Sequence, residues 1–312
     1  MLTTPYDILR LYPVRKTKKQ KQAFRSAVTR YAASLGYEAR EEQGSFGCVN
    51  LVLGDPDKAS FLVTAHYDTC AWMPVPNFIT PCSLLPYILY QIALILAIIL
   101  IPGIFGGVVI LATENDLLGR LLSSFGALML LAMLVIGPAN RSNANDNTSG
   151  VVTVLEIMKS LPVIQRNKVC FVLFDLEEAG LIGSASYRKT HRQSSNTQTI
   201  INLDCVGDGD ELRFFPTKGM KKDMGRMKAL YGCCGYFGSK ALLVADKGIC
   251  FYPSDQMNFP YGVGVAALKK RKKMLYMDKI HTGKDVNLDQ TNVNILRSAI
   301  ISMICCGAVK KG

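Results

Sequence analysis

The feature that most restricts the fold of this chain is a long stretch without charge in its first half. Residues 70–113 contain no Asp, Glu, Lys or Arg. Residues 121–140 are again uncharged and rich in Leu, Met and Ala, and the charged residues between the two runs are Glu114, Asp116 and Arg120. Two apolar runs in tandem, separated by a short polar turn, predict a pair of consecutive apolar helices.

Both runs are long enough to cross a lipid bilayer. Residues 86–112 would form a helix about 40 Å long, and a hydrocarbon core needs only about 20 apolar residues in a helix. We therefore expect residues 78–138 to form an inserted hairpin of two transmembrane helices in contact with the bilayer. A buried core hairpin and a hydrophobic dimerisation arm are the alternatives, and no feature of the sequence indicates an oligomeric state.

The rest of the chain has the pattern of one α/β domain that the insertion divides. Residues 1–77 would form its first part and residues 139–312 the remainder. Apolar strand-like segments alternate with amphipathic segments, which is typical of an α/β fold with a mostly parallel central sheet and helices on both faces. The expected strands are residues 48–53 and 60–65 (as a hairpin or as neighbours), 168–174, 199–203, 241–244 and 263–268, and the expected helices are residues 15–36, 148–161, 179–191, 221–231 and 290–306.

The composition of the chain limits which binding partners and which cellular compartment are expected. The formal net charge of +12 suits either nucleic acid or anionic lipid. No nucleic-acid recognition module accompanies this charge, so no nucleic-acid partner is expected. The basic run at residues 269–273 is interpreted as a solvated surface, with contact to anionic lipid as the alternative. The ten cysteines lack the spacing of a disulfide framework, and residues 1–30 contain no apolar signal segment, which favours a reducing compartment.

Histidines and carboxylates occur in five short segments where expected strands or loops end. Ligands collect at the carboxyl ends of strands in an open α/β sheet, and Zn²⁺ accepts imidazole and carboxylate ligands alike. Taken singly, each segment also suits an ordinary turn or helix cap. The remaining histidine of the chain, His191, is expected on the solvated surface. The residues of the five segments are His66 and Asp68, Asp146, Glu177 and Glu178, Asp204, and His281.

Taken together and in this order, these residues resemble peptidase family M28, the zinc aminopeptidases with two co-catalytic metal ions. The resemblance covers nearly all of the chain outside residues 70–140, and it includes the segment Asp-Asn-Thr-Ser-Gly at residues 146–150. It implies a phosphorylase/hydrolase-like zinc peptidase fold, two zinc ions per chain and hydrolysis of N-terminal peptide bonds in peptide substrates. The implied assignment is Asp146 as the bridging ligand, His66 and Asp204 as ligands of one ion, Glu178 and His281 as ligands of the other, Glu177 as the general base, and Asp68 as the residue that orients His66.

One segment departs from the family's pattern. Family members often carry Ser-Asp-His before a Phe ahead of the last histidine, and here the residues are Ser254, Asp255 and Gln256, followed by Phe259. An amide does not titrate near neutral pH. We therefore do not expect Gln256 to perform a substrate-side role that the family's histidine could have at this position. The proposed metal ligands are unaffected.

Three functional hypotheses follow from the resemblance. The leading one is a membrane-anchored, zinc-dependent aminopeptidase. The second is a single-zinc, glutaminyl-cyclase-like acyltransferase, although those enzymes have pockets rich in Trp and this chain contains only Trp72. The third is a non-catalytic binding or scaffold protein with the same fold. Metal content separates them, since the three would bind two zinc ions, one and none.

The position of the insertion also predicts a topology. A hairpin of two spans returns the chain to its starting side, so both parts of the domain lie on one side of the cell membrane. Basic residues occur on the domain side, at residues 15–30, at Arg141 and at residues 269–273, which favours a catalytic domain that faces the cytoplasm. The insertion begins just after Asp68 and ends just before Asp146, so we expect the active site to open close to the bilayer.

Overall fold

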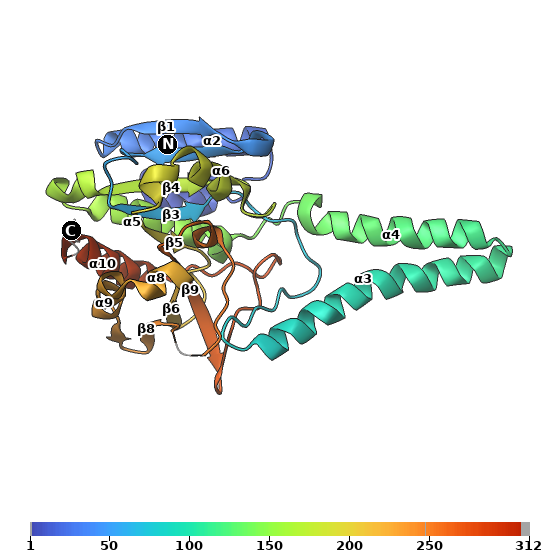
Figure 1. Cartoon of the computed structure of the whole chain (residues 1–312). Helices are drawn as coiled ribbons and strands as arrows, with labels where there is room; N and C mark the ends of the chain where they lie inside the picture. The colour runs from blue at the N-terminus through green and yellow to red at the C-terminus, as the bar shows by residue number, and fades with distance from the viewer. Residues whose placement is uncertain (1, 247, 307–312) are drawn as a thin grey trace.

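The computed structural model describes residues 2–246 and 248–306, and it shows a domain built on one sheet from which a long helical hairpin projects (Figure 1). The strands, in chain order, are β1 (Ala39–Gln43), β2 (Val49–Leu53), β3 (Phe61–His66), β4 (Val169–Phe174), β5 (Thr199–Leu203), β6 (Glu211–Pro216), β7 (Gly235–Phe237), β8 (Lys240–Val244), β9 (Gly262–Arg271) and β10 (Met274–Tyr276).

Parallel strands occupy the centre of the sheet. The order is β1-β2-β4-β3-β5-β9-β6-β8-β7, with β10 paired to β9. Four central strands, β4, β3, β5 and β9, are parallel to one another. On either side of these four, β2 pairs antiparallel with β4 and β6 pairs antiparallel with β9. The expectation that β2 and β3 form a hairpin or neighbouring strands is wrong, because β4 lies between them. The turn at residues 54–57 therefore connects strands that are not adjacent.

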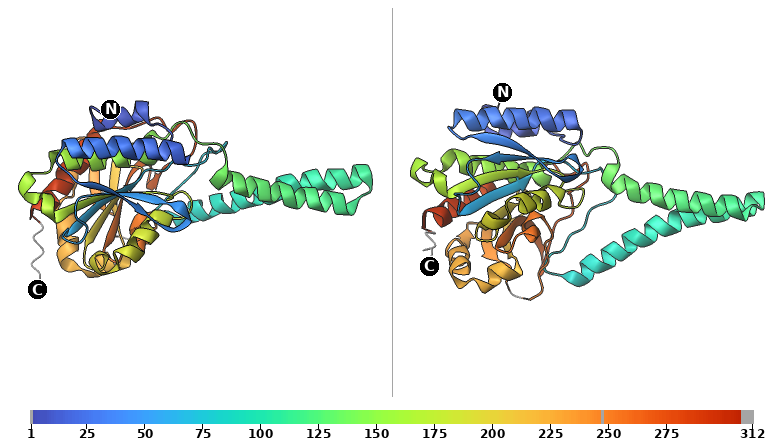
Figure 2. Two further views of the ribbon diagram at one scale, coloured as in Figure 1. Left: turned by 90° about the horizontal axis from the view of Figure 1, so that it is seen from above. Right: turned by 45° about the horizontal axis from the view of Figure 1, so that its top comes forward.

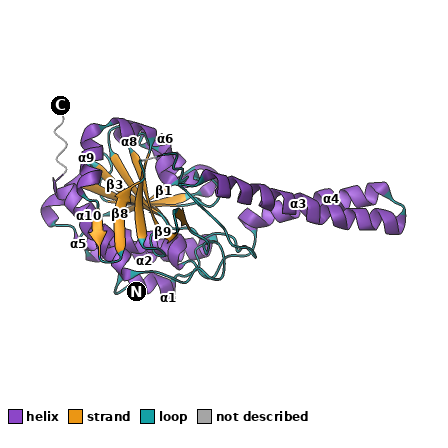
Figure 3. Cartoon of the chain, turned by 90° about the horizontal axis from the view of Figure 1, so that it is seen from below, coloured by secondary structure: helices purple, strands orange, loops and turns teal. Residues whose placement is uncertain are grey.

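Helices cover both faces of the sheet, as the α/β pattern predicts (Figure 3). Helices α2, α5 and α10 pack on one face, and α6 packs on the other. The helices are α1 (Ile8–Leu11), α2 (Lys18–Ser34), α3 (Leu84–Thr113), α4 (Asp116–Ile136), α5 (Gly150–Ser160), α6 (Ile182–Thr190), α7 (Arg192–Ser195), α8 (Lys218–Lys222), α9 (Met224–Gly232) and α10 (Gln290–Cys306), and short helical turns lie at Pro5–Asp7, Ser45–Gly47, Ala144–Ser149, Val163–Lys168 and Asp255–Asn258.

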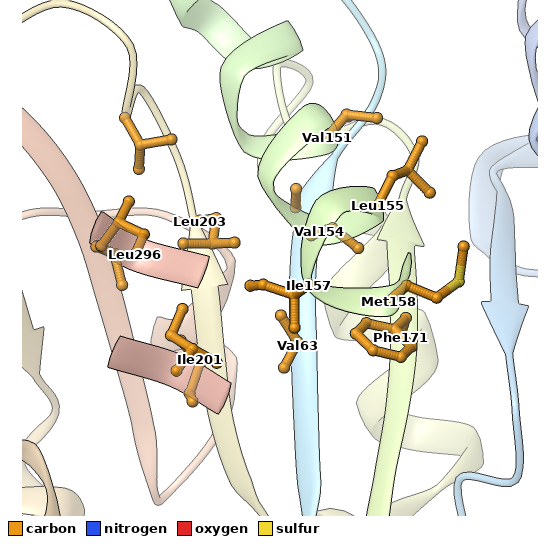
Figure 4. Packing of buried hydrophobic residues seen from close by; sticks show 14 of the residues in the cluster. Val63, Val151, Val154, Leu155, Ile157, Met158, Phe171, Ile201, Leu203 and Leu296 are labelled. Atoms are coloured by element: carbon orange, nitrogen blue, oxygen red, sulfur yellow. The ribbon is translucent and has the colours of Figure 1, made fainter. Parts of the chain in front are cut away.

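The main hydrophobic core forms where α5 lies across the central parallel strands (Figure 4). Val154 and Ile157 of α5 lie close to Val63 of β3, and Met158 lies close to Phe171 of β4. Alternate residues of β2 belong to opposite faces: Leu51 and Leu53 join this core, and Val52 joins the core under α6. This burial on both faces explains why the central strands read as continuous apolar runs.

Helix α2 shows how the local sequence sets an element's ends. The Thr17 side chain accepts a hydrogen bond from the Gln20 backbone N–H at 3.3 Å, and the Gln20 side chain accepts one from the Thr17 N–H at 2.9 Å. This reciprocal capping box satisfies two donors that a helix start leaves free. Phe24 and Val28 then recur at helical spacing and are fully buried, which confirms the helix expected in this region.

The two apolar runs form α3 and α4, which lie side by side and extend away from the domain (Figure 2). Their mean hydropathy is 2.9 and 1.9, and only 11% and 6% of their most apolar windows are buried. The alternative of a buried core hairpin is therefore wrong. Both helices are long and apolar enough to cross a membrane.

Small residues allow α3 and α4 to approach each other closely. A Cβ added at Gly119 of α4 would lie 2.6 Å from the carbonyl oxygen of Gly106 in α3, and one added at Gly126 would lie 3.0 Å from Cβ of Pro102. Glycine at such contacts is a common feature of helix pairs in membranes.

One expectation about the cysteines is corrected by the structure. Cys82, just before α3, and Cys250, in the loop after β8, form a disulfide. The other eight cysteines are unpaired, and Cys305 and Cys306 are exposed. The sequence contains no C-x-x-C spacing, and the two partners lie 168 positions apart, so no local pattern indicates this pair.

Candidate metal centre

The topology of the sheet brings the predicted site residues together. His66 is the last residue of β3, Asp204 directly follows β5, and Glu177 lies three residues after β4. These three strands are parallel neighbours, so their carboxyl ends meet at one edge of the sheet. Asp146 lies in the helical turn Ala144–Ser149. This turn is tied to the end of β5, because the Asn147 side-chain amide donates a hydrogen bond to the Leu203 carbonyl at 2.9 Å.

A first cluster combines one histidine with two carboxylates. His66 Nε2 lies 3.2 Å from Asp146 Oδ1 and 3.5 Å from Asp204 Oδ1. All three side chains are buried. Their donor atoms converge within 4.8 Å of one another, so the three residues together suit a metal ion.

A second cluster uses the other oxygen of the same aspartate. His281 Nε2 lies 3.1 Å from Asp146 Oδ2 and 3.3 Å from Glu178 Oε2. Cys70 is also within reach of this group. Asp146 therefore faces a different histidine with each of its two carboxylate oxygens, which is the arrangement required of a ligand shared by two ions.

The donor atoms fit zinc. Tetrahedral Zn²⁺ with bonds of about 2.1 Å places its ligand atoms about 3.4 Å apart, and the contacts within the two clusters measure 3.1–3.5 Å. Glu178 Oε1 and Asp204 Oδ1 are buried and have no hydrogen-bond donor. Because a buried carboxylate oxygen without a partner is costly, a cation held by these residues would compensate charge that the protein leaves unpaired.

Asp68 connects the first cluster to the segment that carries the two glutamates. Its carboxylate accepts hydrogen bonds from the backbone N–H of Glu177 at 3.1 Å and of Glu178 at 3.3 Å. The same carboxylate lies 3.5 Å from His66 Nδ1. Asp68 therefore faces the ring nitrogen that points away from Asp146, and it also positions Glu177 and Glu178.

The charges at the site shift one another's pKa values. Burial would lower the pKa of His66, but Glu177 and Asp146 raise it well above its usual range. Burial raises the pKa of Glu177 well above that of a free carboxyl group, and Asp204 and Glu178 raise it further against the opposing effect of His66. Burial also raises the pKa of Glu178, in concert with Asp146. A carboxylate with a raised pKa is a stronger base.

Left-handed backbone marks three positions at the site. Leu176, Cys205 and His281 have φ values of 54°, 56° and 63°. Each is a non-glycine residue in a region that costs about 1–2 kcal/mol. Leu176 precedes Glu177 and Cys205 follows Asp204, so this conformation helps to direct these carboxylates. Strained residues of this kind often occur at functional sites.

Two buried residues that support the site are absent from the sequence-based prediction. Asp285 accepts hydrogen bonds from the backbone N–H of Asn145 at 2.8 Å and of Asp146 at 2.9 Å. Arg15 donates through Nη1 to Thr148 at 3.1 Å and also donates to the Tyr67 carbonyl. Asp285 lies four positions after His281, but neither residue belongs to a recognisable motif.

The segment that departs from the family's pattern is buried. Gln256 donates to the Tyr252 carbonyl at 2.7 Å and accepts from Asn202 Nδ2 at 3.2 Å. Asn202 also donates to Ser254 at 2.9 Å. Asp255 is buried nearby, and burial raises its pKa to about 7. Gln256 and Ser254 thus belong to an internal hydrogen-bond network.

The prediction for the third histidine is wrong. His191 is not a solvated residue, because its Nε2 lies 3.0 Å from Glu42 Oε2 and its ring lies 4.4 Å from the ring of Tyr187, measured between centroids. It is far from the two clusters in the fold, at the end of α6. Its role is to pair with β1.

The fold, a mixed sheet with helices on both faces, is shared with solved structures of other proteins. A Zn-dependent exopeptidase from Parabacteroides distasonis superposes with a TM-score of 0.61 at 14% identity, covering 96% of each chain. The LapA aminopeptidase of Legionella pneumophila gives 0.54 at 13% identity, covering 96% of this chain and 69% of its own. The glutaminyl cyclase of Tannerella forsythia gives 0.59 at 14% identity, covering 96% and 97%. At these identities the likeness concerns the fold.

The sequence itself identifies the family. The profile of peptidase family M28 matches residues 131–303. The chain therefore belongs to peptidase family M28, and its resemblance to that family is confirmed. No curated protein sequence matches the chain. The matched region includes five of the candidate site residues and begins after His66 and Asp68.

Proposed function

We propose that this protein is an aminopeptidase that holds two zinc ions and hydrolyses the N-terminal peptide bond of peptides. The observation that carries the proposal is the position of Asp146, whose two oxygens lie 3.2 Å and 3.1 Å from the Nε2 atoms of His66 and His281. One carboxylate between two histidine clusters suits a pair of ions better than a single one. Asp204 completes the first set of ligands and Glu178 the second.

The remaining side chains of the site have separate tasks. Zinc ions, when bound, polarise a carbonyl group and lower the pKa of a coordinated water. Glu177 lies beside His66 and Glu178 but outside the two clusters that share Asp146, so its carboxylate is available to accept a proton from the attacking water and to pass it to the leaving amine. Asp68 fixes the His66 ring and the backbone of both glutamates.

The direct test is hydrolysis of a panel of aminoacyl-amides by the full chain in detergent. We expect turnover with zinc, loss of turnover after treatment with a chelator, and recovery when zinc is returned. An enzyme that hydrolyses the panel equally well in chelator would contradict the proposal. So would a zinc-loaded protein that hydrolyses none of the amides.

The fold shared with the Tannerella forsythia glutaminyl cyclase favours one alternative function. In that case the chain would bind one zinc ion and cyclise N-terminal glutamine with release of ammonia. A peptide that begins with glutamine separates the two functions: an aminopeptidase releases free glutamine, and a cyclase releases ammonia and leaves the peptide bond intact. A non-catalytic protein would do neither.

We further propose that α3 and α4 anchor the enzyme in a lipid bilayer through residues 78–138. Helix α4 has 21 residues and is therefore about 31 Å long, which matches a hydrocarbon core of about 30 Å. The exposed side chains along both helices are mainly Leu, Ile, Val, Phe and Met. A dimerisation arm remains the competing interpretation, and it predicts a soluble dimer where the membrane anchor predicts partition into liposomes.

For the orientation, we propose a catalytic domain that faces the cytoplasm of the cell. The chain has 36 Lys and Arg residues against 24 Asp and Glu. The loop between α3 and α4, residues 114–115, contains no Lys or Arg, and the basic residue next to it is Arg120, near the start of α4. The Cys82–Cys250 disulfide is the feature that favours the opposite side. Eight unpaired cysteines, including the exposed Cys305 and Cys306, favour a reducing compartment.

A further inference from the structure

Backbone hydrogen bonds join the two roots of the helical hairpin to the metal site. The Trp72 N–H donates to the Pro138 carbonyl at 2.8 Å, and the Asn140 N–H donates to the Cys70 carbonyl at 3.1 Å, so the entering and leaving segments pair with each other. The next residue along the entering segment, Met73, donates to the His281 carbonyl at 2.8 Å. The end of α4 therefore has a fixed position relative to a candidate metal ligand.

A cavity of about 250 Å³ lies between the last turn of α4 and the metal site. Asp68 and Glu178 from the site line this cavity, and so do Val135 and Ile136 of α4. The two apolar side chains are 49% and 78% exposed. Lys16, which also lines the cavity, donates through its ammonium group to the Val135 carbonyl at 2.8 Å. This contact satisfies one carbonyl at the end of the helix, and the Val135 and Ile136 side chains line the same cavity as Glu178, together with Lys16 and Lys21.

The length of α4 sets the depth of this cavity in a bilayer. The helix begins at the polar tip of the hairpin and is about 31 Å long, so Ile136 would lie at the boundary between hydrocarbon and headgroups. Trp72, the only tryptophan of the chain, lies at the same root and is 43% exposed. Tryptophan is enriched at this level of a bilayer.

We infer that Val135 and Ile136 form an apolar subsite of the active site at the membrane surface. The substrates are peptides that carry apolar residues near their N-terminus and partition into the bilayer interface. An apolar side chain placed against Val135 and Ile136 removes apolar surface of both partners from water, and the peptide reaches Glu178 without leaving the interface. This inference rests on the proposed aminopeptidase function.

The first test compares two substrates in detergent, where no bilayer concentrates either of them. The preference for trileucine amide over trialanine amide, measured as the ratio of the two kcat/KM values, should fall about tenfold in the double variant Val135→Ser/Ile136→Ser. The matched control is Ile164→Ser, because Ile164 is 80% exposed and lies on a helical turn after α5 that does not line this cavity. This control should keep the wild-type ratio.

The outcomes separate the inference from the function on which it rests. An active double variant with the wild-type ratio would overturn the apolar subsite and leave the aminopeptidase intact. A wild-type protein that hydrolyses neither amide with zinc bound would overturn the proposed function and the substrate class together.

The second test measures depth and needs no activity. In liposomes that contain the full chain, lipids brominated near the headgroup end of the acyl chain should quench Trp72 fluorescence more strongly than lipids brominated near the chain terminus. Trp72→Phe provides the background, because it removes the only tryptophan. Stronger quenching by the deep label, or no quenching above background by either lipid, would overturn the interfacial placement.

Discussion

Asp146 is the residue on which the geometry of the metal site depends. Its carboxylate lies within 3.2 Å of one histidine and 3.1 Å of the other, and both histidines lower its pKa against the effect of burial. The backbone N–H of Asp146 donates a hydrogen bond to the Asp285 carboxylate at 2.9 Å. A side chain with these contacts suits a metal ligand, and we propose Glu177, which lies outside the two shared clusters, for proton transfer.

These different positions predict different defects. Glu177→Gln should lower kcat by about 10²–10⁴-fold with bound zinc unchanged, because an amide cannot accept the proton of the attacking water. Asp146→Ala should lose both zinc and activity. Metal analysis alongside turnover checks both variants, and wild-type turnover by the Glu177→Gln protein would refute the assignment of the base.

His191 predicts a pH dependence of stability that is independent of the metal site. The hydrogen bond with Glu42 raises the pKa of His191 above its usual value of 6.5. A raised pKa in the folded state means that the pair stabilises the fold fully below about pH 6.5, and that this stabilisation is lost as pH rises through the folded-state pKa. His191→Gln should therefore lower the melting temperature by about 2 °C at pH 6 and by less at pH 9. An equal decrease at both pH values would contradict the ion pair.

Most of the residues proposed for the site could be named from the sequence because they lie at or just after the ends of β3, β4 and β5. The supporting residues could not. Asp285 acts through two backbone N–H groups, and Arg15 acts through a carbonyl and a hydroxyl group, so neither belongs to a pattern of side-chain types that a sequence displays. Their positions depend on how distant loops meet in the folded chain.

At the scale of elements, the hairpin depends on close contact between glycines. A Cβ on Gly119 would lie 2.3 Å from Ile110 Cγ1 and 2.6 Å from the Gly106 carbonyl oxygen, whereas a Cβ on Gly107 would meet no atom within 4 Å. Helices that pack through glycine separate when a larger side chain is introduced. Gly119 and Gly107 therefore form a matched pair for substitution.

Gly119→Val should lower the melting temperature of the full chain in detergent by about 5 °C relative to Gly107→Val. Both variants replace glycine by valine within an apolar helix, in the first turn of α4 at Gly119 and in the last two turns of α3 at Gly107, so the change in helix propensity is similar in kind. Equal melting temperatures would show that α3 and α4 do not pack as the structure describes.

The elements that were predictable from sequence are those buried on both faces. Every residue of β4 and β5 is buried, and the expected ranges of these strands agree with the structure to within one residue. β1 was missed because it is an edge strand with the sequence Ala-Arg-Glu-Glu-Gln, in which no residue is fully buried. The order of β2, β4 and β3 was also missed, since β4 comes from a segment more than 100 residues away in the chain and separates two strands that a short turn connects.

At the scale of the whole molecule, the hairpin divides the chain but leaves the sheet whole. β3 precedes the insertion and β4 and β5 follow it, and the three strands are hydrogen-bonded to one another. Both parts of the sheet must therefore lie on the same side of a membrane. If α3 and α4 span the membrane as proposed, the tip between them lies on the opposite side.

This topology predicts the accessibility of the tip. A cysteine introduced at Asn115, in a background that lacks other exposed thiols, should react with a membrane-impermeant thiol reagent in intact cells, because the catalytic domain is expected in the cytoplasm. A protein labelled at this position only after lysis would reverse the orientation. Reaction in neither condition would place the tip within the bilayer or in a protein contact.

The central claim is that Asp146 is shared by two zinc ions, and the zinc content of the purified protein tests it most directly. The full chain is loaded with zinc in detergent, freed of excess metal by dialysis and analysed by mass spectrometry of the metal against protein concentration. The account predicts two zinc ions per chain, and the same ratio for Glu177→Gln, whose side chain is not among the proposed ligands. A ratio of one, or a protein that retains no zinc, would contradict it.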